Sequence, residues 1–199
     1  MTIRTGPNNH VEMVHRPGEA HLACKVLGLL GYEMTKASTD FAGAAWWSSA
    51  DKVLWLSEVT PEQWAFEQWL QRQLASGPAE DGGFAQGVKV LPQKYPHFGV
   101  GKTTLEDWER TVARLYAAVD GDPELAGRVS LPLVKRPEDE GSVASATGGR
   151  IGRTLYQAFL RTDIFASGLL TLGQGIEVQH YRENDPAWTG ETAELAVAG

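Results

Sequence analysis

The sequence lacks three things: a second cysteine, a long apolar run and a cluster of basic residues. Its single cysteine, Cys24, excludes an internal disulfide framework and fits a reducing compartment. No stretch approaches the roughly 20 apolar residues that a membrane helix needs. The first residues, MTIRTGPNNH, contain no hydrophobic signal core. These absences predict a cytoplasmic protein that has no membrane partner.

The charge balance argues against a nucleic-acid partner. The formal net charge is −7, and no basic run is present that could contact a phosphate backbone. Hydrophobic residues make up 42% and charged residues 22% of the 199 residues, which is ordinary for a chain that buries a core. We therefore expect one domain or two small fused modules.

The stretch TLGQGIEVQHY, residues 171–181, alternates as a half-buried strand does. Ile176 and Val178 point to one face, and Glu177 and Gln179 point to the other. A carboxylate in the middle of such a strand is costly unless a cation receives it. The strand therefore predicts a cationic partner for Glu177.

Two earlier strands carry a histidine in the corresponding place. They read NHVEM, with His10, and PHFGV, with His97. Two imidazoles and a carboxylate that come from three strands can hold one metal ion. The alternative for each histidine is a hydrogen-bonded side chain that lines a pocket. We predict that His10, His97 and Glu177 bind one divalent metal ion.

The order of predicted elements is βαβββ, and it occurs twice. The first set is a strand at 10–14, a helix at 19–30 and strands at 32–36, 44–48 and 52–59. The second set is a strand at 96–101, a helix from Thr103, and strands at 127–135, 155–161 and 175–181. The predicted fold class is α+β: two βαβββ modules, at 9–59 and 95–181, that form an internal repeat. A helical insertion at 60–94 separates the modules, and 182–199 is a tail.

Two helix starts have clear signals. Thr60 is the expected cap of the insertion helix, with Pro61 at the first helical position. Thr103 is the expected cap of the second module's helix, and Glu106 is its capping-box partner. The insertion helix has a predicted apolar side made of Trp64, Phe66, Trp69, Leu70 and Leu74.

The run GVGKTT, which includes Lys102, does not fit a phosphate-binding loop. Such a loop needs a glycine five residues before Gly101, and Pro96 stands there. Proline also lacks the backbone N–H that would bind phosphate. The run is therefore interpreted as a strand end followed by a helix cap.

Four motifs in this order resemble the vicinal oxygen chelate superfamily, which includes glyoxalases, extradiol dioxygenases and bleomycin-resistance-like binding proteins. The motifs are HVEMV, LLGYEM, PHFGVG and GQGIEVQHY, and they cover roughly residues 9–181 apart from insertions at 60–90 and 138–152. The resemblance implies a cup of curled sheets around a divalent metal, with His10, His97 and Glu177 as ligands.

The fourth ligand position of the family departs from its pattern in this chain. Aligning KVLWLSEV with QGIEVQHY matches Trp55 to Glu177 and Ser57 to Gln179. Tryptophan cannot bind a metal, so three protein ligands remain and several coordination positions stay open. That arrangement suits Fe(II) and dioxygen chemistry.

Other residues are candidates for catalysis or substrate contact. Glu12, Tyr181 and His180 are the catalytic candidates, although alternation turns His180 to the outer face. The candidate substrate contacts are Trp55, Gln157 and Gln179, and each could equally be a residue of the pocket lining or the core.

Three functions follow from these observations. The first is a metal-dependent enzyme that acts on a small oxygenated substrate, with Fe(II) dioxygenase chemistry favoured. The second is a non-redox isomerase, epimerase or lyase that uses the metal as a Lewis acid. The third is a small-molecule binding or resistance protein without catalysis. A homodimer and a monomer are both compatible with two modules in one chain.

Overall fold

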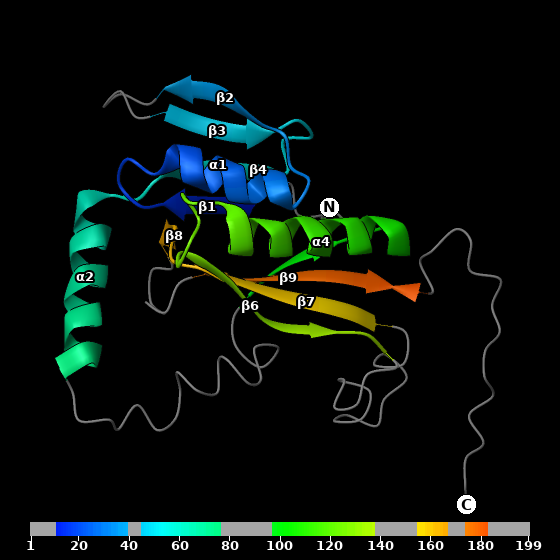
Figure 1. Cartoon of the computed structure of the whole chain (residues 1–199). Helices are drawn as coiled ribbons and strands as arrows, with labels where there is room; N and C mark the ends of the chain where they lie inside the picture. The colour runs from blue at the N-terminus through cyan, green and yellow to red at the C-terminus, as the bar shows by residue number, and fades with distance from the viewer. Residues whose placement is uncertain (1–10, 40–44, 77–96, 138–154, 167–173, 183–199) are drawn as a thin grey trace, which may run out of the picture.

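The computed structural model describes residues 11–39, 45–76, 97–137, 155–166 and 174–182. The fold is α+β, with two mixed sheets (Figure 1). The first module contains β1 (Val11–His15), α1 (Ala20–Leu29), β2 (Met34–Thr39), β3 (Ala45–Ser49) and β4 (Leu54–Glu58), and α2 (Pro61–Ser76) follows it. The second contains β5 (Phe98–Gly101), α4 (Leu105–Gly121), β6 (Val129–Lys135), β7 (Leu155–Thr162), β8 (Phe165–Ala166) and β9 (Gln174–Tyr181).

The two modules share one topology. The strand order is β2-β3-β4-β1 in the first sheet and β6-β7-β9-β5 in the second. In each sheet the opening strand pairs in parallel with the closing strand, β1 with β4 and β5 with β9, while the other neighbours are antiparallel. Both sheets are therefore mixed, and the predicted repeat of βαβββ is confirmed in the order and pairing of these strands.

One strand of the second module was missed from the sequence. β8 follows β7 and pairs antiparallel with β1, so a segment of the second module completes the sheet of the first. Two residues are too short for an alternation signal. Arg128, just before β6, supports this exchange because its guanidinium contacts Asp163 at 2.6 Å and Glu19 at 2.7 Å. These ion pairs fix the turn before β8 to the start of α1.

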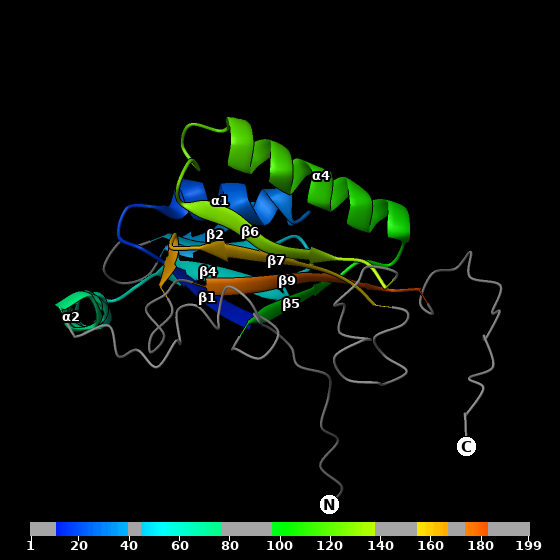
Figure 2. The ribbon, with the colours of Figure 1, turned by 60° about the horizontal axis from the view of Figure 1, so that its bottom comes forward.

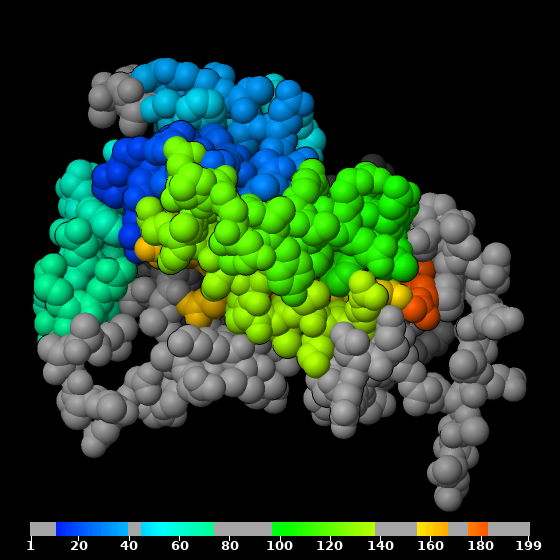
Figure 3. Space-filling model, in the orientation of Figure 1, coloured from blue at the N-terminus to red at the C-terminus, as the bar shows by residue number. Residues whose placement is uncertain are grey.

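Both long helices of the modules lie on the same side of the sheets (Figure 2). The space-filling view shows α1 and α4 as neighbouring blue and green surfaces (Figure 3). The core lies beneath them, where Val26, Leu27, Leu115 and Val178 are among the buried side chains. The opposite face of the sheets is therefore the one that remains for a site.

The capping predictions had different outcomes. Thr60 caps α2 as expected, since its Oγ1 accepts from the Gln63 backbone N–H at 3.2 Å. Thr103 is not the cap of α4: Thr104 fills that position and accepts from the Asp107 N–H at 3.1 Å. Either threonine fits the sequence rule, and a shift of one residue decides which hydroxyl reaches the helix. The predicted partner Glu106 instead accepts from Arg110.

The predicted apolar side of α2 is wrong in part. Phe66 is 45% exposed and Trp69 is 49% exposed, and their rings stack with centroids 5.9 Å apart. Glu67, by contrast, is only 2% exposed. The helix lies at the edge of the molecule instead of lying across a sheet (Figure 1), and Arg16 covers the Trp64 ring at 5.1 Å. No helix among the described residues is both long and apolar enough to cross a membrane.

Lys102 connects the modules. Its Nζ donates to the carbonyl oxygen of Leu30, at the end of α1, at 2.5 Å. Burial lowers the pKa of this amine, and the positive charge of Arg114 lowers it further. The carbonyl oxygen of Lys102 in turn contacts Nδ1 of His180 at 2.9 Å. The lysine of the GKTT run therefore has a structural partner, in line with its interpretation as a strand end.

We expect Lys102→Met to lower the free energy of unfolding by about 1–3 kcal/mol, because a hydrogen bond from a charged donor is lost. The affinity for ATP should not change, since the lysine amine is directed at α1. Urea denaturation and ATP titration measure the two quantities. Lys36→Met, at an exposed position of β2, is the control and should stay within about 0.5 kcal/mol of the parent protein. Micromolar ATP binding that disappears in Lys102→Met would contradict this account.

Candidate metal site

The central strand of the second sheet, β9, presents Glu177 on the face opposite α4. Its neighbours Ile176 and Val178 are fully buried. The backbone carbonyl of Val178 accepts the indole N–H of Trp108, from α4, at 3.0 Å. Because strand side chains alternate, Glu177 points away from this helix. It pairs with Phe159 of β7 and with Gly99 of β5.

His97 and Glu177 meet on that face. His97 lies directly before β5, and its Nε2 is 3.1 Å from Oε2 of Glu177. The side chain of Glu177 is 8% exposed and that of His97 is 24% exposed. Phe159 packs edge-on against the imidazole, with centroids 5.2 Å apart and an interplanar angle of 81°. Both side chains are therefore largely shielded from solvent.

The second carboxylate oxygen of Glu177 has its own partner. Gln157 of β7 donates from Nε2 to Oε1 at 2.6 Å. Both residues are buried, at 4% exposure for Gln157 and 6% for Glu177. A buried carboxylate without partners would be costly, and here both of its oxygens have one. Gln157, a predicted substrate contact, thus donates an amide N–H to Glu177 instead.

Glycines leave room on the β5 side of the pair. Gly99 lies opposite Glu177, and Gly101 lies opposite Gln179. A Cβ at Gly99 would stand 3.5 Å from Nε2 of Gln179, and one at Gly101 would meet no atom within 4 Å. No side chain of β5 therefore stands opposite Glu177. Gln179, another predicted substrate contact, lies close to Gly99.

The pairing registers confirm the predicted equivalence of Trp55 and Glu177. Trp55 pairs with Glu12 in the first sheet, and Glu177 pairs with Gly99 in the second. In the sequence, Glu12 lies two residues after His10, as Gly99 lies two residues after His97. The position that corresponds to Glu177 in the first module is thus a tryptophan. His10 lies outside the described residues.

The first sheet offers a different set of side chains. Ser57 donates to Oε1 of Glu12 at 2.8 Å, so this catalytic candidate is joined to β4. Trp55 donates its indole N–H to the Lys52 carbonyl at 2.9 Å, and its ring meets that of Trp46 at 6.4 Å and 72°. Trp55 and Trp46 therefore form a partly exposed aromatic pair. Trp55 lies on β4, which corresponds to β9, and Trp46 lies on β3, which corresponds to β7.

The two remaining catalytic candidates point to opposite faces. His180 is 1% exposed and packs against Tyr156, so it belongs to the helix-covered core. Tyr181 alternates to the face of Glu177. Burial raises the pKa of Tyr181, and the charge of Glu177 raises it further. Tyr181 therefore keeps its proton at neutral pH in the metal-free protein and can donate a hydrogen bond.

Sequence reasoning missed two residues of this face, Phe159 and Arg161. Both share it with Gln157 because side chains of β7 alternate. Burial lowers the pKa of the Arg161 guanidinium from its usual value. The signal was present in LYQAFLR, where every second residue could be assigned to the face of Gln157.

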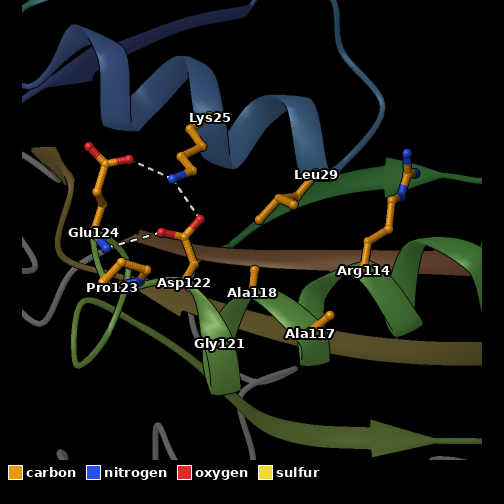
Figure 4. Close-up of a pocket in the computed structure, with 9 residues that line it drawn as sticks. All are labelled: Lys25, Leu29, Arg114, Ala117, Ala118, Gly121, Asp122, Pro123 and Glu124. Carbon is orange, nitrogen blue, oxygen red and sulfur yellow. Dashed lines mark hydrogen bonds and ion pairs between the residues drawn. The ribbon is translucent and has the colours of Figure 1, made fainter.

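A groove on the opposite, helical side is not part of this site. Leu29 of α1 and Ala118 of α4 line it, and Lys25 bridges Asp122 and Glu124 across it (Figure 4). Both ion pairs measure 2.6 Å. The groove thus marks where α1 and the end of α4 are joined by charge. Lys25 pairs with Asp122 and Glu124, and Arg114 donates to Thr111 of its own helix.

Within the described ranges, no three His, Cys, Asp or Glu side chains form a metal-binding group. The structure brings together two of the three predicted ligands, His97 and Glu177. Comparison of the chain with protein-family models, curated proteins and solved structures found no match. Assignment to the vicinal oxygen chelate superfamily thus stays a proposal.

Proposed function

We propose that this chain is a metal-dependent enzyme of the vicinal oxygen chelate type that acts on a small oxygenated substrate. One divalent ion, with Fe(II) favoured, is held by His97, Glu177 and His10. The observation that carries the proposal is the 3.1 Å approach of His97 Nε2 to Glu177 Oε2. The role of His10 as a metal ligand is proposed from its place in the sequence. It lies directly before β1, as His97 lies directly before β5.

The geometry of His97 and Glu177 suits two ligands of one metal. Imidazole nitrogen and carboxylate oxygen bind such ions at about 2.0–2.2 Å. Two ligands at right angles around the ion then lie roughly 3.0 Å apart, close to the separation of these two atoms. Neutral imidazole and carboxylate are also the donor types of the facial 2-His-1-carboxylate site.

The residues around the pair support chemistry on a small substrate. An Fe(II) ion would supply one-electron chemistry with dioxygen, whereas other divalent ions would supply Lewis acidity. Trp55, in place of a fourth ligand, leaves coordination positions for substrate oxygens. Gly99 and Gly101 place no side chain of β5 opposite Glu177 and Gln179, and Tyr181 can donate a hydrogen bond on the same face. We place the enzyme in the cytoplasm, in keeping with its lone cysteine.

Two other functions remain candidates. A non-redox isomerase, epimerase or lyase would use the same ligands, and the neutral Tyr181 favours it because a phenol can protonate or stabilise an enolate. A binding protein without catalysis is favoured by Trp46 and Trp55, whose edge-on rings offer apolar surface to a planar ligand. Metal identity and oxygen dependence separate the first two functions, and retained metal separates both from the third.

We expect oxygen uptake after anaerobic reconstitution with Fe(II). An oxygen electrode with a panel of catechols and 2-oxo acids measures it. Activity should disappear in His97→Ala, whereas His21→Ala, at an exposed position of α1, should keep it. If no substrate causes oxygen uptake and the native protein contains zinc, nickel or manganese, the oxygenase proposal fails. The isomerase or lyase function then takes its place.

A further inference from the structure

Gln157 and Glu177 form a hydrogen-bonded pair that joins β7 to β9 beneath the proposed metal site. The amide nitrogen of Gln157 lies 2.6 Å from Oε1 of Glu177. Phe159 is the residue directly opposite Glu177, so Gln157 reaches it diagonally across the two strands. Both side chains are buried, which restricts the rotamers of each.

Chemistry fixes which end of the amide faces Glu177. An ionised carboxylate only accepts hydrogen bonds, so the NH₂ group of Gln157 must face it. The two oxygens of Glu177 then have different partners: Oε1 is bound by Gln157, and Oε2 is turned to Nε2 of His97 at 3.1 Å. The carboxylate is thus oriented before any ion arrives.

We propose that Gln157 is a positioning residue that makes Glu177 a ligand through Oε2 alone and so keeps one coordination position free for substrate. The inference rests on the proposed function. A carboxylate can bind a metal through one or both of its oxygens. The hydrogen bond to Oε1 opposes rotation of the carboxylate toward a two-oxygen mode, in which it would occupy a further position.

A neutral donor suits this task better than a charged one. Arginine or lysine at position 157 would pair with Glu177 and repel a divalent cation through its own charge. An apolar residue would leave Oε1 buried without a partner. The glutamine amide satisfies the oxygen and adds no charge. Phe159 restricts the other ligand in a comparable way, because its ring packs edge-on against His97.

The test uses Co²⁺ alone as the probe, since its visible bands report coordination number. We expect Gln157→Met, which has similar volume and no donor, to weaken Co²⁺ binding by about 10–100-fold, as for other partners of metal ligands. The band intensity should change as Glu177 alters its binding mode. Leu155→Met is the matched control: it places the same side chain two residues earlier on the same strand and face. It should keep both affinity and spectrum.

The outcomes separate this inference from the proposed function. Wild-type affinity and spectrum in Gln157→Met would overturn the positioning role while the metal site stands. If the parent protein itself binds no Co²⁺, the proposed function fails, and the positioning role, which rests on it, fails with it. If Gln157→Met does not fold, Gln157→Asn, whose amide is too short to reach, takes its place.

Discussion

Replacement of Glu177 by alanine is expected to weaken divalent metal binding by more than about 100-fold, and His97→Ala should do the same. Loss of an outer partner of a metal ligand typically costs 10–100-fold, and loss of the ligand itself should cost more. Titration with Co²⁺ under anaerobic conditions measures the effect, and circular dichroism establishes that each variant is folded. Because neutral imidazole is the binding form, affinity should also fall on acidification.

The matched control for His97 is His21, which is exposed on α1, on the helical side of the molecule. His21→Ala should bind Co²⁺ as the parent protein does. Folded His97→Ala and Glu177→Ala proteins that retain full affinity would show that the ion, if there is one, binds elsewhere.

Trp108→Ala should lower the free energy of unfolding by about 3–5 kcal/mol, the range for removal of a large aromatic side chain from a core. Trp108 is 1% exposed, and its indole N–H donates to the carbonyl of Val178 at 3.0 Å. Its ring also meets that of Tyr156 at 5.4 Å. The substitution removes a contact of α4 with β9, the strand that carries Glu177. Urea denaturation measures the loss.

Tyr116→Ala on the same helix is the control. Tyr116 is 46% exposed, so its removal should change the unfolding free energy by no more than about 0.5 kcal/mol. Equal effects of the two substitutions would contradict the view that α4 is stabilised by burial of Trp108 against the second sheet.

The regular elements of the fold were predictable because their signals are local. Alternation placed Ile176 and Val178 in the core and Glu177 on the other face, as the structure has them. Helix starts were less certain, since Thr103 and Thr104 are both acceptable caps. β8 was not predictable, because Phe165 and Ala166 are defined as a strand only by pairing with β1 of the other module.

The candidate site was predictable only in part. The approach of His97 to Glu177 followed from matching strands. The contact from Gln157 to Glu177 did not, since the sequence does not specify how β7 aligns with β9. The exposed ring of Trp69 also had no signal in the sequence, because its helical spacing is that of a core residue.

Elemental analysis of the protein, purified without chelators or an affinity tag, tests the central claim most directly. The account predicts about one divalent ion per chain in the parent protein and none in His97→Ala. A folded parent protein with no bound metal, even after incubation with Fe(II), would contradict it, as would an ion that His97→Ala retains in full.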